Sequence, residues 1–200
     1  MDIYKITGLK QGVRNPNRVN VYINDKFAFS LDISQVVDLK IKIGLEISSE
    51  QFEELKKAAE FGKMYQRALE WTLLRPRSEK ECRDYLRRKF AISSDEIILR
   101  LKDRGYLDDY RFAEWYIENR FLKKGISLKR LKMELVKKGV SQDIINEALN
   151  RSSRNDREEI LKIIVKKRIR YDDEKLINYL CRQGFSYQLV SELVQSYGTD

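Results

Sequence analysis

The chain contains no histidine, only two cysteines and two prolines, and nine glycines among its 200 residues. Without histidine it lacks the commonest general base, the Ser–His and Cys–His nucleophile pairs, and the imidazole ligands of most zinc sites. The nine glycines are scattered and form no glycine-rich phosphate loop. We therefore expect no metal and no cofactor, and an enzyme of this composition would have to rely on carboxylates alone.

Cysteine and long apolar runs are equally scarce. Cys82 and Cys181 are too few for a disulfide framework and both fall in helical patterns, so we expect two reduced thiols. The apolar runs are only a few residues long, which argues against a membrane span. The start, MDIYKITGLK, lacks the layout of a signal peptide. Together these features predict a cytoplasmic protein that has no membrane partner.

The net charge of +9 is concentrated in the middle of the chain. Residues 61–110 carry 12 basic and 9 acidic side chains, and residues 111–155 carry 11 and 5. The flanking segments, 1–60 and 156–200, are balanced. A local basic excess is typical of a surface for phosphates or for an acidic protein face. A solubilising surface is the alternative explanation.

Residues 1–47 have the composition of β-strands. YKITGL, RVNVYIN and KFAFSLD are rich in β-branched and aromatic residues. The last two flank a short turn around Asn24, Asp25 and Lys26, which predicts a hairpin. Ser48, with Gln51 three residues later, forms a capping box that predicts a helix through roughly residue 60.

The remainder of the sequence has the apolar spacing of helices. Pro76 ends one predicted helix, and Gly105 caps the C-terminus of another. Capping boxes that begin at Ser78 and Ser93 start two more.

Three segments of this helical region resemble one another. They are CRDYLRRKF (82–90), LKMELVKKG (131–139) and LINYLCRQG (176–184). Each has a leucine at its fifth position, namely Leu86, Leu135 and Leu180, and each lies between two further helical patterns. The sequence thus predicts a mainly α protein of three tandem three-helix repeats behind a small N-terminal β-strand region. Stacked repeats would form an elongated, curved array that suits a long partner such as a filament or a nucleic acid strand.

These patterns divide the chain into four expected segments. They are an N-terminal β extension with one helix (1–62), repeat one (63–107), repeat two (108–153) and repeat three (154–200).

Two adjacent acids stand where repeat one ends and repeat two begins. Asp108 and Asp109 could be a catalytic carboxylate pair, or they could cap the start of a helix. Phe112, Trp115 and Tyr116 follow at helical spacing and look like a core stripe. A cap followed by a core face explains this segment better than catalysis.

Several segments together resemble the RecX family of bacterial regulators of the RecA recombinase. They are LLRPRSEKECRDYLRRK (73–89), RGYLDDYRFAEWYIENR (104–120) and KKGISLKRLKMELVKKGV (123–140). SLDISQVVDLKIKIGLEIS (30–48) looks like the β extension of some family members. The resemblance is strong from about residue 65 to 150. Phe90 departs from the family, which often has glycine there, and the third repeat lacks strong signature residues.

The resemblance implies a non-enzymatic protein that binds the RecA filament in its groove and modulates it, usually by inhibition. RecA's strand-exchange, ATPase and coprotease activities would be affected, and through them homologous recombination, DNA repair and the SOS response. Some family members also bind DNA, so single- or double-stranded DNA is a second expected partner of what we expect to be a monomer. A sequence-nonspecific DNA-binding helical-repeat protein is the alternative, and an enzyme that uses Asp108 and Asp109 is a third possibility.

Basic residues beside the leucine stripes are the candidates for filament or DNA contacts. They are Arg83, Arg87, Arg88, Lys89, Lys123, Lys124, Lys129, Arg130, Lys132, Lys137 and Lys138. For any one lysine at the end of a helix, the alternative is that it merely satisfies the helix dipole, worth about 0.3–1 kcal/mol. Because Lys132, Lys137 and Lys138 lie off the leucine stripe, we expect their replacement to leave the core intact.

Overall fold

The computed structural model describes residues 3–13, 15–91, 94–122 and 124–197, which form two compact units. Unit 1 comprises the residues up to Trp71 together with Asp95–Ile97. Unit 2 comprises Thr72–Ser94 and the residues from Ile98 onward.

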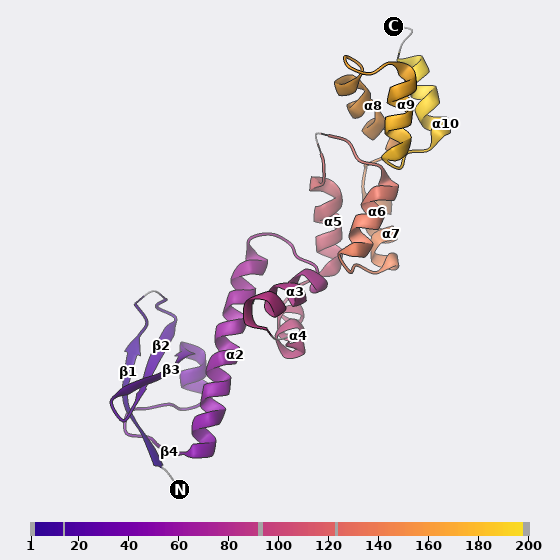
Figure 1. Ribbon diagram of the computed structural model, residues 1–200. Helices are drawn as coiled ribbons and strands as arrows, with labels where there is room; N and C mark the ends of the chain where they lie inside the picture. Colours follow the sequence, from indigo (N-terminus) through magenta and orange to yellow (C-terminus); the bar gives the residue numbers. More distant parts are fainter. Residues whose placement is uncertain (1–2, 14, 92–93, 123, 198–200) are drawn as a thin grey trace. The chain divides into compact units, whose positions relative to one another are not determined.

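Unit 1 is built on an antiparallel sheet. Its strands are β1 (Ile3–Gln11), β2 (Arg18–Ile23), β3 (Lys26–Asp32) and β4 (Glu46–Ser48), in the order β3-β2-β1-β4 (Figure 1). The predicted hairpin between β2 and β3 is confirmed, and its turn residues Asn24 and Asp25 have φ values of 48° and 63°. Asn and Asp tolerate this left-handed backbone better than most residues.

Unit 1 also contains two helices. They are α1 (Ile33–Asp38) and α2 (Ser49–Leu73). In the core of unit 1, inward side chains of the sheet, such as Ile6, Val21 and Leu31, form one apolar cluster with Leu55 and Ala59 of α2. The first half of α2 therefore supplies the apolar surface that covers the sheet. Neither α1 nor β4 was expected from the sequence.

The start of α2 is as predicted, but its end is not. The Gln51 amide donates to Ser48 Oγ at 3.2 Å, and the Ser48 amide donates to Gln51 Oε1 at 2.9 Å, which completes the capping box. The predicted end near residue 60 is wrong, because α2 continues to Leu73. The expected boundary between residues 62 and 63 falls inside this helix, and the bounds of the four segments stay a prediction.

Unit 2 is helical. Its helices are α3 (Glu79–Phe90), α4 (Asp95–Asp103, whose first residues belong to unit 1), α5 (Asp109–Asn119), α6 (Leu128–Lys137), α7 (Gln142–Arg151), α8 (Asp156–Lys167), α9 (Asp173–Arg182) and α10 (Tyr187–Ser196). The predicted cap at Ser93 lies outside the described residues. Across the part of the chain that the structure describes, no helix has the length and apolar composition of a membrane span.

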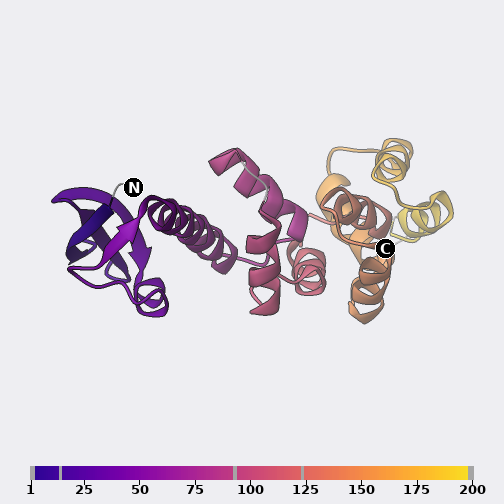
Figure 2. The ribbon, with the colours of Figure 1, turned by 90° about the horizontal axis from the view of Figure 1, so that it is seen from below.

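The predicted repeat is confirmed in the order and packing of these helices. The marker leucines Leu86, Leu135 and Leu180 are completely buried. α5, α6 and α7 share one apolar cluster, and α8, α9 and α10 share another, with its three helices packed side by side (Figures 1 and 2). The mainly α class with an N-terminal sheet is therefore as expected, whereas the curved array stays a prediction.

Candidate partner-binding surface

Helix α6 has a buried face and a solvent-exposed face. Ser127 caps its start by accepting a hydrogen bond from the Arg130 amide at 3.2 Å, and Leu131 and Leu135 are completely buried. The opposite face, here called the α6 stripe, consists of Lys129, Lys132, Met133, Val136 and Lys137, all exposed. Their spacing of three and four residues places them together along the helix. The stripe thus offers three cations with two apolar side chains between them.

Several of the predicted binding residues also form contacts within the protein. Arg83 forms an ion pair with Glu79 at 2.9 Å. Arg130 pairs with Glu134 at 3.4 Å and also contacts Gln183.

Lys138 forms an ion pair of 2.5 Å with Glu81 of α3. The expectation that replacing Lys138 leaves the core intact stays a prediction, but it did not include this ion pair. A glutamate at that position would face Glu81 across the contact between two repeats.

The other candidates are more exposed. At the end of α3, Arg87 pairs with Asp84 at 3.3 Å, Arg88 Nε donates to the Asp84 carbonyl at 3.2 Å, and Lys89 is exposed. Lys124 lies 5.9 Å from the centre of the Phe121 ring.

In the α6 stripe, Lys132 Nζ donates to Asn146 Oδ1 at 3.2 Å. Lys123 lies outside the described residues.

A hydrogen-bonded joint connects repeat one to repeat two. The Ser78 hydroxyl accepts from the Glu81 amide at 3.1 Å, as the cap of α3, and donates to the Lys138 carbonyl at 2.7 Å. Beside it, the Glu79 amide donates to Asp109 Oδ1 at 2.7 Å. One serine and one aspartate therefore hold the start of α3 against the end of α6 and the start of α5.

The same joint recurs between repeats two and three. The Ser127 hydroxyl donates to the Gln183 carbonyl at 2.7 Å, and the Leu128 amide donates to Asp156 Oδ1 at 2.8 Å. The fit is close at Gly184, where φ is 94° and an added Cβ would lie 2.9 Å from Ser127 Oγ. The sequence repeat thus includes the contacts between neighbouring units as well as their cores.

The two adjacent aspartates have different roles in this arrangement. Asp108 Oδ1 accepts from the Tyr110 and Arg111 amides at 2.8 and 3.2 Å and so caps α5, as predicted. Asp109 does not cap α5; it accepts from the start of α3. Burial raises the pKa of Asp109 above its ordinary value, and the Glu79 amide opposes that shift. Both carboxylates accept backbone amides, which is a structural role.

Glu81 is the ionic centre of the first joint. Its carboxylate lies 3.2 Å from Arg75 Nη1 and 2.5 Å from Lys138 Nζ. Burial by itself raises the pKa of Glu81, but the hydrogen bonds from Lys138 and Arg75 outweigh it, so the pKa lies below its ordinary value. The ionised form of Glu81 therefore stabilises the contact between the two repeats.

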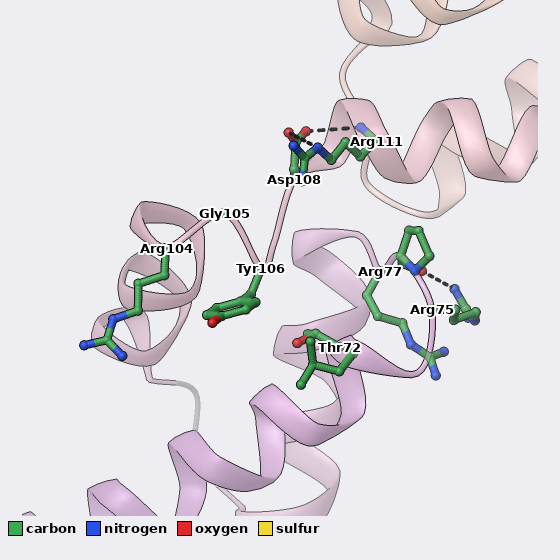
Figure 3. A pocket seen from close by; sticks show the side chains of 10 residues that line it. Thr72, Arg75, Arg77, Arg104, Gly105, Tyr106, Asp108 and Arg111 are labelled. Carbon is green, nitrogen blue, oxygen red and sulfur yellow. Dashed lines mark hydrogen bonds and ion pairs between the residues drawn. The ribbon is translucent and has the colours of Figure 1, made fainter. Parts of the chain in front are cut away.

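Unit 2 also contains a pocket that none of the predicted binding residues lines. Its volume is about 360 Å³, and four arginines line it: Arg75, Arg77, Arg104 and Arg111 (Figure 3). Thr72, Tyr106 and Asp108 are the other polar side chains in its lining. The sequence contained a signal for it, because LLRPRS and RGYLDDYR supply nearly the whole lining, but nothing in the sequence showed that the two segments meet.

The fold and this basic surface define a class: helical-repeat proteins with an N-terminal β region and no evident catalytic centre among the described residues. Family models match two parts of the chain, the regulatory protein RecX N-terminal domain at residues 4–48 and the RecX second three-helix domain at residues 108–149.

Regulatory protein RecX of Bacillus subtilis is 32% identical to the chain over 196 residues, which cover 93% of this chain and 74% of that protein. Its counterpart in Bacillus licheniformis is 30% identical over 200 residues, which cover 95% and 76%. The chain belongs to the RecX family of regulatory proteins.

Two solved structures have a similar fold. A crystal structure of regulatory protein RecX matches with a TM-score of 0.72 at 21% identity, covering 96% of this chain and 99% of that one. The crystal structure of RecX from Lactobacillus salivarius matches with a TM-score of 0.55 at 26% identity, covering 69% and 96%.

Proposed function

We propose that this protein binds the filament of the RecA recombinase and modulates it, with inhibition as the expected direction. The recombinase, ATPase and coprotease activities of RecA would fall together, because one bound regulator would affect the filament on which all three depend. In this proposal the protein is a cytoplasmic, monomeric regulator without catalytic activity, acting in homologous recombination, DNA repair and the SOS response.

The α6 stripe is the observation that carries this proposal. Lys129, Lys132 and Lys137 face solvent on a helix whose opposite face is fixed in the core. Met133 and Val136 are 54% and 51% exposed between them. Apolar side chains surrounded by cations suit a protein partner that has an acidic rim, since the cations steer association and the apolar groups add buried area.

Reversing the charge of the stripe tests the proposal. We expect Lys129→Glu, Lys132→Glu and Lys137→Glu together to abolish co-sedimentation with RecA filaments and the inhibition of RecA's ATPase. Wild-type binding should weaken as salt rises, because exposed charges are screened over about 10 Å at 0.1 M salt. Thermal stability should change little, since exposed substitutions usually shift it by less than about 0.5 kcal/mol.

A matched control has the same change in net charge at exposed lysines of unit 1. Lys26→Glu, Lys42→Glu and Lys57→Glu serve this purpose. If the control loses binding as fully as the stripe variant, the effect is one of net charge. If the folded stripe variant inhibits RecA like the wild type, the stripe is not the interface, and Arg87, Arg88 and Lys89 become the next candidates.

The rival proposal, sequence-nonspecific DNA binding, rests on the same basic surface. The two are separated by sedimentation with RecA in the absence of DNA, where only a direct RecA contact brings the protein down. For DNA alone, the logarithm of affinity should fall linearly with the logarithm of salt concentration.

A further inference from the structure

The two joints of unit 2 share the bonds of a serine and an aspartate, but their further contacts differ in kind. At the first joint, between repeats one and two, two of these contacts come from lysines. Lys80 Nζ donates to the Lys137 carbonyl at 2.9 Å, and Lys138 Nζ pairs with Glu81. Lys80 is exposed, and the Lys138 side chain is 38% exposed. A lysine ammonium is a point charge on a flexible stem, so these contacts can follow a partner that moves.

An arginine also lies at the first joint. Arg75 forms its ion pair with Glu81 of its own repeat and reaches repeat two at the Trp115 ring, 4.9 Å from the ring centre. The attraction of a cation to a ring face is electrostatic and involves no hydrogen bond that would fix an angle. The contacts that the first joint adds to the shared bonds therefore tolerate a change of angle.

The second joint, between repeats two and three, contains a buried guanidinium. Arg154, in the loop between α7 and α8, holds both carboxylate oxygens of Glu159, with Nη2 2.8 Å from Oε2 and Nε 3.2 Å from Oε1. Its Nη1 also donates to the carbonyls of Ile117 and Arg120 at the end of α5. The two charged side chains are only 7% and 1% exposed. A planar guanidinium with this many acceptors fixes direction as well as distance.

Glu159 carries the connection on to the loop before α6. Its Oε2 accepts from the Ile126 amide of repeat two at 2.9 Å. Burial by itself raises the pKa of Glu159, but the hydrogen bonds from Arg154 and Lys162 outweigh it, so the pKa lies below its ordinary value. At Gly125 the backbones also approach closely, because an added Cβ would lie 2.6 Å from the Glu159 carbonyl oxygen. One ionised pair at the start of repeat three is thus bonded to main-chain groups at both ends of the α5–α6 loop.

The first joint has apolar side chains where the second has this pair. Counted from the aspartate of each joint, Leu107 corresponds to Arg154. Phe112 corresponds in the same way to Glu159. Leu107 and Phe112 are 3% and 0% exposed, so they pack as core residues. Apolar packing is non-directional, and it holds two surfaces together without fixing the angle between them as hydrogen bonds do.

We propose that repeats two and three form one rigid arm, locked by Arg154 and Glu159, and that unit 2 bends at the first joint. The α6 stripe belongs to repeat two, so it moves together with repeat three and changes its orientation relative to repeat one. RecA takes no part in this device, so the proposal stands or falls separately from the proposed regulation of RecA.

Distances between pairs of spin labels, measured by double electron–electron resonance on the full chain, test the proposal. Cys181→Ser removes the half-buried thiol, while Cys82 is completely buried. Labels at the exposed positions of Lys89→Cys and Asn150→Cys span the first joint, and labels at Asn150→Cys and Gln188→Cys span the second. We expect the distance distribution across the first joint to be about twice as broad as that across the second, or broader. Equal widths, or a broader distribution across the second joint, overturn the proposal.

A conservative substitution tests the cause. Arg154→Lys keeps the charge beside Glu159 but loses the planar fork, so the distribution across the second joint should broaden to about the width found across the first. Arg157→Lys is the matched control, because Arg157 pairs with Glu192 at 2.9 Å within repeat three, and it should leave the width unchanged. A folded Arg154→Lys protein with the narrow wild-type distribution contradicts the lock. Should that variant not fold, the two wild-type distributions still decide where the unit bends.

Discussion

At the scale of single residues, neighbouring carboxylates stabilise different parts of the chain. Asp108 caps its own helix through amides two and three residues away, a contact that the sequence predicts because capping is local. Asp109 accepts from Glu79, thirty residues earlier. Nothing in the local sequence distinguishes the two acids, because the partner of Asp109 is set by how the repeats pack.

This difference predicts unequal effects of alanine. Asp108→Ala should cost about 0.5–2 kcal/mol, as for the loss of a cap. Asp109→Ala should cost about 1–3 kcal/mol, because it leaves the Glu79 amide without its acceptor in a partly buried joint. Asp109→Asn should be milder, since its amide oxygen still accepts and burial already disfavours the charge. Urea unfolding compares the three variants. A larger loss for Asp108→Ala would contradict the assignment of the joint to Asp109.

At the scale of elements, α2 shows where sequence periodicity is misleading. Gly62 costs about 1 kcal/mol relative to alanine inside a helix, yet α2 runs through it. The reason is a close approach of α1: a Cβ at Gly62 would lie 2.6 Å from Gln35 Oε1, and Gln35 Nε2 donates to the Ala58 carbonyl at 2.9 Å. Packing against a helix that the sequence did not reveal thus accounts for the glycine.

The contact between α3 and α6 should be sensitive to acid through Glu81. Because its pKa in the folded protein is lowered, its contribution is fully present above the unfolded pKa of about 4.3 and is lost as pH falls through the lower folded value. Glu81→Gln should therefore be less stable than wild type at pH 7, and the gap should narrow below about pH 4. Urea midpoints measured across this range provide the test. A gap that stays constant with pH would show that the charge of Glu81 does not matter.

At the scale of the whole molecule, the apolar clusters are separate along the sequence. The buried cluster of unit 1 extends from Ile6 to Ala59, whereas those of α5–α7 and α8–α10 begin at Phe112 and Ile160. Each cluster comes from one continuous stretch of sequence, so the spacing of apolar residues along that stretch predicts the repeats and the sheet. The joints and the arginine pocket were not predictable, since they depend on contacts between residues far apart in the sequence.

A chain that starts at Met64 should test this separation. It lacks the entire cluster of unit 1 but keeps both later clusters, so we expect a helical circular dichroism spectrum and a cooperative melt. Under the proposed function it should also co-sediment with RecA filaments. An unfolded fragment would mean that the β region is part of one common core.

The joints between repeats depend largely on main-chain atoms. In the hydrogen bonds that the two joints share, the Lys138 and Gln183 carbonyls and the Glu79 and Leu128 amides are main-chain groups. These shared bonds therefore require only a serine and an aspartate as side chains. The third repeat shares few side chains with the others, yet it docks by the same bonds. The exposed side chains of each repeat can therefore change, and with them the ligand that the repeat binds. The hydrogen bonds that attach successive repeats stay the same.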